Sequence, residues 1–123
     1  HIGRDIRFLP HVAPFFRGIS LSIAAELERP VTVSELAEVY GDFYAACPLI
    51  EVRGEIPEVA EVRGTHRVIV GGFAVSTAHP ERVSLVAVLD NLLKGAATQA
   101  VQNLNLAFGL HATAGLDDRG GVQ

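Results

Sequence analysis

The sequence predicts an α+β fold, in which helices cover a mixed, mostly antiparallel sheet and a long helix comes last. Period-two alternation of apolar residues, the pattern of a strand with one buried face, is one observation behind this prediction. Another is that the strand-like segments 68–75 and 82–89 are separated only by turn-like residues, which favours an antiparallel hairpin. Finally, segments 33–46 and 92–108 carry apolar residues at helical spacing.

Two strands are predicted in the amino-terminal part of the chain. Residues 6–9 are expected to form a short strand that runs into a loop at 11–16, because a residue that precedes proline is held extended. The second strand should cover 19–27. The alternation predicts that this strand buries one apolar face, made of Ile19, Leu21, Ile23, Ala25 and Leu27.

A helix is predicted from about Val33 to Ala46. Thr32 and Glu35 have the spacing of a capping box, in which a hydroxyl and a carboxylate each accept a free backbone amide of the first turn. One stripe of the helix is apolar and is expected to cover the sheet. It consists of Leu36, Val39, Tyr40, Phe43 and Tyr44.

The rest of the chain is expected to supply the middle of the sheet and the last helix. A short strand at 49–53 precedes an irregular stretch that is rich in Gly and Pro. Within 83–89 Ser84 alone is polar, which predicts burial on both faces of a central strand. The last helix should run from 92 to about 108, with Gly109 as its cap, and 117–123 should be a flexible tail.

Composition excludes several classes of protein. The net charge is −4, and no cluster of Lys or Arg interleaves with aromatic residues, so nucleic acid is not expected as a partner. Charged or amide residues interrupt every apolar run before the roughly 18 residues that cross a bilayer, so no membrane segment is expected. Cys47 is the single cysteine and the amino terminus does not resemble a signal peptide, which together favour a reduced, intracellular protein.

The junction between the last strand and the last helix carries the most informative residues. Gly95, Ala96 and Ala97 lie in the first turn of this helix, so a flat ligand could approach the backbone closely. Asp90 or Asn91 would cap the free amides of that turn, and an amide side chain can both donate to and accept from a carboxamide. The alternative is a capped helix that packs small residues against a sheet.

The same segment carries a family resemblance. Asp-Asn-Leu-Leu-Lys-Gly-Ala-Ala at 90–97, Gln-Ala-Val-Gln-Asn-Leu-Asn-Leu at 99–106 and the following Phe-Gly-Leu resemble the carboxy-terminal signature of N-acetyl-gamma-glutamyl-phosphate reductases. Pro-His-Val-Ala-Pro at 10–14 and Arg-Gly-Ile at 17–19 resemble the opening of that family's substrate and dimerisation domain. Aspartate-semialdehyde dehydrogenases share Lys-Gly-Ala-Ala but not the continuation. The resemblance extends to about Leu116.

The resemblance implies an NADPH-dependent reduction of an acyl phosphate to a semialdehyde in arginine biosynthesis, through a thioester on a cysteine. By that likeness, Asn91 would contact the nicotinamide carboxamide, and Lys94 and Gly95 would lie beside the NADP cofactor. Residues 1–116 would form the substrate and dimerisation domain of a homo-oligomer. Its terminal helix, 90–108, would pack on a nucleotide-binding (Rossmann) domain. The expected location is the cytoplasm, or the mitochondrion if the source is fungal.

The family's nucleophilic cysteine, catalytic histidine and glycine-rich phosphate loop all lie upstream of the segments matched here. We therefore assign no catalytic residue to this chain and expect it to be inactive alone. Three alternatives to the reductase remain as hypotheses: a lysine-pathway paralogue, an aspartate-semialdehyde dehydrogenase, and a non-catalytic oligomerisation module.

Further polar residues could have a role in binding or chemistry. Arg17 is the stronger substrate-binding candidate, because its planar fork of donors suits a phosphate or carboxylate. His11 could bind the anionic substrate next to Arg17, or it could anchor the loop through a hydrogen bond. Cys47 follows a helix carboxy terminus, where the macrodipole disfavours a thiolate, so it is expected to be structural.

The remaining candidates are expected to have no role in chemistry. His66, His79 and His111 lack the spacing of metal ligands, so no metal site is predicted. The recurring acidic residues of the irregular stretch are read as a solvated edge, with no catalytic role. They are Glu51, Glu55, Glu58 and Glu61.

Overall fold

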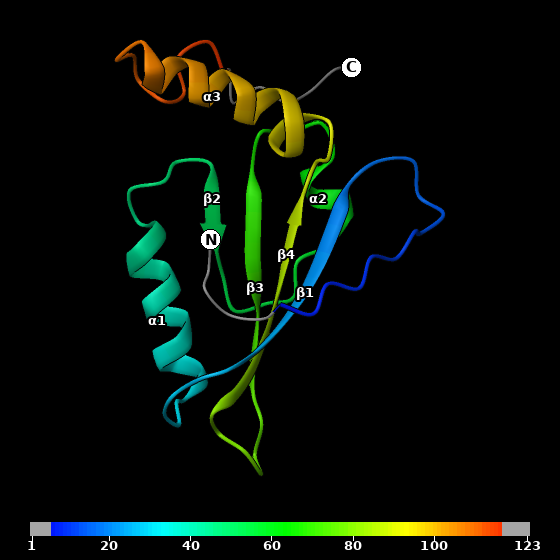
Figure 1. Ribbon diagram of the computed structural model, residues 1–123, viewed down its shortest axis with the longest axis vertical. Coiled ribbons are helices and arrows are strands. Elements are labelled where there is room, and N and C mark those ends of the chain that lie inside the picture. Colours follow the sequence, from blue (N-terminus) through cyan, green and yellow to red (C-terminus); the bar gives the residue numbers. More distant parts are fainter. Residues whose placement is uncertain (1–5, 117–123) are drawn as a thin grey trace.

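The structure is a computed structural model and describes residues 6–116. Its sheet contains β1 (Ile19–Glu26), β2 (Ile50–Val52), β3 (Val68–Val75) and β4 (Arg82–Leu89). The strand order is β1-β4-β3-β2, with β1 and β3 antiparallel to β4 and β2 parallel to β3 (Figure 1). The predicted mixed, mostly antiparallel sheet and the hairpin of β3 and β4 are therefore confirmed.

Helices cover parts of both faces and one end of this sheet. α1 (Val33–Tyr44) lies beside β2 and β3, whereas α3 (Thr98–Ala107) runs across the ends of the strands (Figure 1). A π-helical turn, η1 (Leu93–Ala97), precedes α3 directly, so the predicted last helix is present with an unpredicted first turn. The short α2 (Val59–Val62) was not predicted.

The predicted strand at residues 6–9 is wrong. Residues 6–18 contain only bends and irregular backbone, and no strand pairs with them among the described residues. The proline after Leu9 restricts the backbone of Leu9, but an extended residue without a partner strand does not become part of a sheet. The tail predicted to be flexible, 117–123, lies outside the described residues.

The capping box at the start of α1 is confirmed. The backbone amide of Thr32 donates to Oε2 of Glu35 at 2.7 Å, and the amide of Glu35 donates to Oγ1 of Thr32 at 3.2 Å. α1 ends two residues earlier than predicted, because the amides of Ala45 and Cys47 turn back to carbonyl groups three residues before them. The helix therefore begins where the sequence indicated and ends in a tighter turn.

The core is divided between the two faces of the sheet. On the α1 face, six buried side chains pack together: Leu36, Val70, Phe73, Val83, Leu85 and Ala87. On the opposite face, Val62 of α2 packs against Ile69 and Val88. β4 thus contributes buried residues to both faces, as its continuous apolar run predicted.

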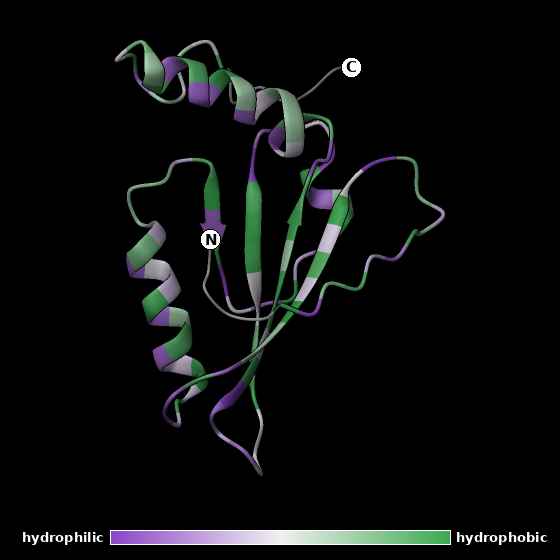
Figure 2. Ribbon diagram, viewed as in Figure 1, coloured by the Kyte–Doolittle hydropathy of each residue, from purple (hydrophilic) through white to green (hydrophobic). Residues whose placement is uncertain are grey.

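The apolar face of β1 is not buried as predicted. Ile19, Leu21 and Ile23 are 37%, 39% and 40% exposed. The register pairs Leu21 with Ala87 and Ile23 with Leu85, which places them on the α1 face, but α1 packs against β2 and β3. Figure 2 shows the hydrophobic residues of β1 at alternate positions along the strand. The α1 face of the sheet is therefore covered over only one half.

The apolar stripe of α1 is narrower than predicted for the same reason. Leu36 is buried and Tyr40 is partly buried against Phe73, with ring centroids 5.3 Å apart. Val39 and Phe43, which the prediction included in the stripe, are 62% and 76% exposed.

Gly109 caps α3 as predicted. With φ at +68°, its amide donates to the carbonyl of Leu106, and the amide of Leu110 donates to the carbonyl of Asn105. These two bonds form a Schellman motif. The buried amide of Asn105 also donates to the carbonyls of Ala112 and Ala114, so the segment after α3 folds back onto it.

Candidate functional site

The corner between β4 and α3 is an open turn with small side chains. The amide of Gly95 donates to the carbonyl of Asp90 at 2.8 Å and that of Ala97 to the carbonyl of Leu92 at 3.1 Å. Bonds over five residues widen the turn relative to an α-helix, and such turns are frequent at functional sites. Gly95, Ala96 and Ala97 are all exposed. The side-chain-poor corner predicted from the sequence is thus present on the surface.

Asp90 lies under this corner with its side chain fully buried. Its Oδ1 accepts the amides of Leu92 at 2.9 Å and Leu93 at 2.8 Å, so Asp90 rather than Asn91 caps the turn. Its Oδ2 accepts the amide of Gly64 at 2.8 Å, from the loop between α2 and β3. The carboxylate therefore joins two segments of the backbone.

Arg17 contacts the same carboxylate from the amino-terminal loop. Its Nε lies 2.5 Å from Oδ2 of Asp90, and its side chain is 27% exposed. The Nε–H is not aimed at the oxygen well enough to count as a hydrogen bond, so we describe the contact as an ion pair. Burial alone would raise the pKa of the Asp90 carboxyl, but the amides of Gly64, Leu93 and Leu92 and the Arg17 guanidinium hold that pKa below its ordinary value.

Asn91 fixes the next residue of the same loop. Its Oδ1 accepts the amide of Gly18 at 2.8 Å, across a separation of 73 residues. Gly18 has φ at +115°, a conformation that residues with a side chain rarely adopt. Because the oxygen of Asn91 is bound within the protein, its Nδ2 is the group that could meet a ligand.

Lys94 lies along the start of α3. Its Nζ donates to Oε1 of Gln99 at 3.0 Å and to Oε1 of Gln102. Burial lowers the pKa of the Lys94 amino group. Lys94 and Gly95 are therefore at the predicted corner, and two amide side chains hold the ammonium group of Lys94 against the helix.

His11 and Cys47 do not join the cluster around Asp90. His11 is exposed, and its Nδ1 donates to the carbonyl of Leu9 at 3.0 Å, which matches the loop-anchoring alternative. Cys47 is a free, partly buried thiol just after α1. The structure thus brings Arg17, Asn91, Lys94 and Gly95 to one end of the sheet and leaves His11 on the exposed loop.

Two of the four acidic residues considered in the sequence, Glu51 of β2 and Glu61 of α2, form ion pairs with arginines. Glu61 accepts two hydrogen bonds from the guanidinium of Arg53, at 2.9 and 2.6 Å, and Arg67 lies 3.0 Å from Glu51. The Arg53 guanidinium and the Glu58 amide lower the pKa of Glu61 to about 2. An acid held ionised in this way is poorly suited to proton transfer near neutral pH. Over residues 6–116 no group of three or more His, Cys, Asp or Glu residues could hold a metal ion.

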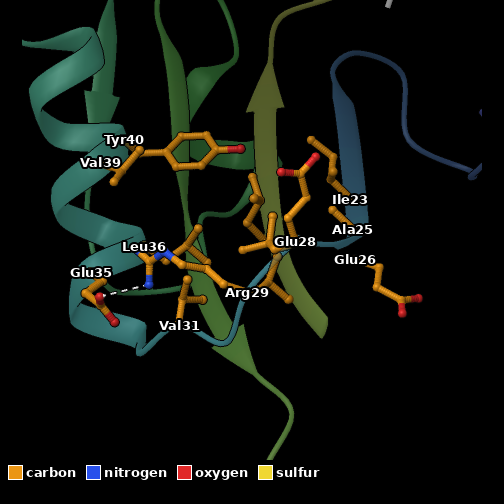
Figure 3. A pocket seen from close by; sticks show the side chains of 13 residues that line it. Ile23, Ala25, Glu26, Glu28, Arg29, Val31, Glu35, Leu36, Val39 and Tyr40 are labelled. Carbon is orange, nitrogen blue, oxygen red and sulfur yellow. Dashed lines mark hydrogen bonds and ion pairs between the residues drawn. The ribbon is translucent and has the colours of Figure 1, made fainter. Parts of the chain in front are cut away.

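A groove lies on the uncovered half of the α1 face, with a volume of about 740 Å³. Ile23, Ala25, Val83 and Leu85 of the sheet line it together with Leu36 and Tyr40 of α1. Figure 3 shows these walls and the charged residues at one end, where Arg29 pairs with Glu35 at 3.3 Å. In the described part of the chain no helix is long and hydrophobic enough to cross a bilayer.

Residues 2–91 match the family described as "Semialdehyde dehydrogenase, dimerisation domain", and the chain belongs to this family. The N-acetyl-gamma-glutamyl-phosphate reductase of Xanthomonas campestris pv. campestris strain B100 is 51% identical to it over 108 residues, which are 88% of this chain and 34% of that protein. "Bifunctional protein argC, mitochondrial" of Dictyostelium discoideum is 47% identical over 94% of this chain and 13% of its own length. The chain thus spans about a third of the bacterial relative.

Solved structures with a similar fold include aspartate-semialdehyde dehydrogenases. A probable aspartate-semialdehyde dehydrogenase from Pseudomonas aeruginosa superposes with a TM-score of 0.64 and 34% identity, over 80% of this chain and 30% of that one. Aspartate semialdehyde dehydrogenase II from Vibrio cholerae has the same TM-score with 30% identity, over 78% and 28% of the two chains. These matches agree with the α+β fold predicted from the sequence.

The roles of Gly18 and Gly64, whose amides donate to the two residues that follow β4, were not predicted from the sequence. One signal was available. Asp90 directly follows the mostly apolar strand β4, and a carboxylate buried at such a position requires several donors from elsewhere in the chain.

Proposed function

We propose that this chain is the substrate and dimerisation domain of an N-acetyl-gamma-glutamyl-phosphate reductase. The enzyme reduces N-acetyl-gamma-glutamyl phosphate to N-acetylglutamate semialdehyde with NADPH, in arginine biosynthesis. The observation that carries the proposal is the exposed corner at Asn91–Ala97, which holds the reductase-like signature and is joined to the Arg17 loop through Asp90 and Asn91. Relatives named as this reductase support it.

The corner fits a nicotinamide. Gly95, Ala96 and Ala97 are exposed and carry no side chain larger than a methyl group, so a flat ring can lie against the turn. The Nδ2 of Asn91 would donate to the carboxamide oxygen of NADP, and Gly95 with Lys94 would border the ring. NADP, when bound, supplies or takes up the hydride of the reaction.

Arg17 would bind the acyl phosphate or the carboxylate of the substrate. Asp90 contacts its Nε, which leaves the two terminal nitrogens of the guanidinium for an anion. His11 lies six residues before Arg17 on the same loop, and because its Nδ1–H donates to Leu9, its Nε2 would donate to that anion in the imidazolium form. The part of the enzyme beyond this chain would supply the nucleophile and the proton-transfer groups, so this domain's contribution is binding and orientation.

We propose that the uncovered half of the α1 face joins two copies of the domain. The groove and the half-exposed Leu21 and Ile23 of β1 form one apolar surface, and hydrophobic surfaces of this kind are typical of permanent oligomers. Ile23→Asp should convert the dimer to monomer on a sizing column. Ser22→Asp, on the opposite face of the same strand, should not. A dimer that persists in Ile23→Asp would place the interface elsewhere.

The activity is tested with the complete enzyme that contains this domain, assayed in the direction of phosphate-dependent NADP reduction. N-acetylglutamate semialdehyde should give a kcat/KM at least about 100-fold above that for aspartate semialdehyde, because a site built to pair a polar group discriminates against a substrate without it. The reverse preference would favour the aspartate-semialdehyde dehydrogenase reading, which the solved structures make the second candidate. A higher kcat/KM for a carrier-linked amino-adipyl semialdehyde would favour the lysine-pathway paralogue.

The location would follow the source organism. Two relatives carry "mitochondrial" in their names, from Dictyostelium discoideum and Schizosaccharomyces pombe. We propose the mitochondrion for a fungal source and the cytoplasm for a bacterial one.

A further inference from the structure

The buried carboxylate of Asp90 contacts groups from several separate parts of the chain. The amides of Leu92 and Leu93 come from the cofactor-side corner, that of Gly64 from the loop before β3, and Arg17 from the amino-terminal loop. A buried charge is costly unless its oxygens are satisfied, and here Oδ1 accepts two backbone amides while Oδ2 accepts one amide and pairs with the Arg17 guanidinium. The carboxylate is thus satisfied only while these segments keep their relative positions.

The adjacent residue repeats the link. Asn91 holds the amide of Gly18 at 2.8 Å, while Asp90 holds Nε of Arg17 at 2.5 Å. Two neighbouring residues of the corner therefore bind two neighbouring residues of the loop. A shift of the loop relative to η1 would strain both contacts together, because the Asp90 carboxylate cannot follow such a shift without leaving the amides of Leu92, Leu93 and Gly64.

We propose that Asp90 is a positioning residue, whose carboxylate couples the anion-binding Arg17 to the nicotinamide-binding Asn91 and sets the geometry between the two ligands. This inference rests on the proposed function and deepens it, because Asp90 itself would touch neither ligand. Binding of substrate at Arg17 and of NADP at the corner would then be energetically linked, and the linkage would act in both directions.

Asp90→Asn separates this role from the capping role. The substituted side chain keeps one oxygen, which can still accept the amides of Leu92 and Leu93. The other oxygen becomes an amide nitrogen, which is a hydrogen-bond donor and therefore cannot accept the Gly64 amide. The substituted side chain also carries no charge to pair with the Arg17 guanidinium. The corner should remain capped while its connection to the loop is lost.

The experiment measures NADP affinity and the KM for the semialdehyde and for phosphate in the complete enzyme. Asp90→Asn should weaken NADP binding by about tenfold or more. It should also raise the KM for the semialdehyde or for phosphate, whichever Arg17 binds, by about tenfold or more, with a smaller change in kcat. Thr98→Val is the matched control, because Thr98 is also almost fully buried and bonded to His66 at 2.7 Å, yet takes no part in the link. It should lower thermal stability and leave the NADP affinity and the two KM values unchanged.

Arg17→Gln provides a second test that does not depend on the folding of Asp90→Asn. Arg17 is partly exposed and is placed on the substrate side, yet its loss should also weaken NADP several-fold. If Arg17→Gln alters the substrate KM alone, or if Asp90→Asn behaves like Thr98→Val, the coupling role is refuted. Wild-type enzyme without phosphate-dependent NADP reduction would instead refute the proposed function, so the two failures are distinct.

Discussion

Gly18→Ala is expected to destabilise the domain at the point where the loop meets the sheet. Gly18 has φ at +115°, and a Cβ built on it would lie 2.2 Å from Cγ1 of Val59. Real atoms do not approach so closely, so the loop, the Val59 side chain or the amino terminus of α2 must move. The movement would also stretch the 2.8 Å hydrogen bond from Gly18 to Asn91.

The magnitude follows from these two losses. Backbone strain in the left-handed region costs about 1–3 kcal/mol, and loss of the hydrogen bond adds about 0.5–1.5 kcal/mol. We therefore expect the free energy of unfolding to fall by about 2–4 kcal/mol, which lowers Tm by on the order of 10 °C in a domain of this size. Circular dichroism during thermal unfolding measures the change.

Gly109→Ala is the matched control. Gly109 also has a positive φ, at +68°, but a Cβ there meets nothing within 4 Å. It should cost about 1–2 kcal/mol from backbone strain alone. Equal losses in the two variants would contradict the steric argument and would mean that the contact between Gly18 and Val59 does not constrain the loop.

Three further predictions concern separate contacts. Thr32→Ala removes the cap of α1 and should lower the free energy of unfolding by about 1 kcal/mol in a urea titration, whereas no loss would mean that the helix forms without its cap. The stabilising contribution of ionised Glu61 is complete above its unfolded pKa of 4.5 and is lost as pH falls through about 2, so Glu61→Gln should flatten the stability profile over that range. A profile as steep as that of the wild type would assign the acid sensitivity to other carboxyls. Asn91→Ala should weaken NADP binding and lower turnover in the complete enzyme, and unchanged kinetics would remove Asn91 from the site.

The fold could be predicted because its main elements have local signatures. β3 and β4 are apolar runs separated by a turn, and Thr32 with Glu35 marks the start of α1. α2 has only four residues, too few for a period to emerge. The π-turn at η1 was missed because its apolar residues have the spacing of an α-helix, and the fifth-residue bonds leave no mark in the sequence.

The exposed face of β1 could not be predicted, because alternation shows that a face is apolar and not what covers it. The candidate site was likewise predictable only in part. The cap, the small residues and the amide at 91 were all visible in one segment of sequence. That Asn91 binds Gly18 and Asp90 meets Arg17 depends on the sheet order, which brings residues 73 positions apart into contact.

The central claim is that the corner at Asn91–Ala97 receives the nicotinamide ring. Amide chemical shifts of the complete enzyme, recorded by NMR during titration with NADP, test it most directly. We predict that the side-chain amide of Asn91 and the backbone amides of Gly95, Ala96 and Ala97 shift in step with binding, while those around Gly109 do not. Saturation with NADP that leaves the Asn91–Ala97 signals unmoved would contradict the proposed site.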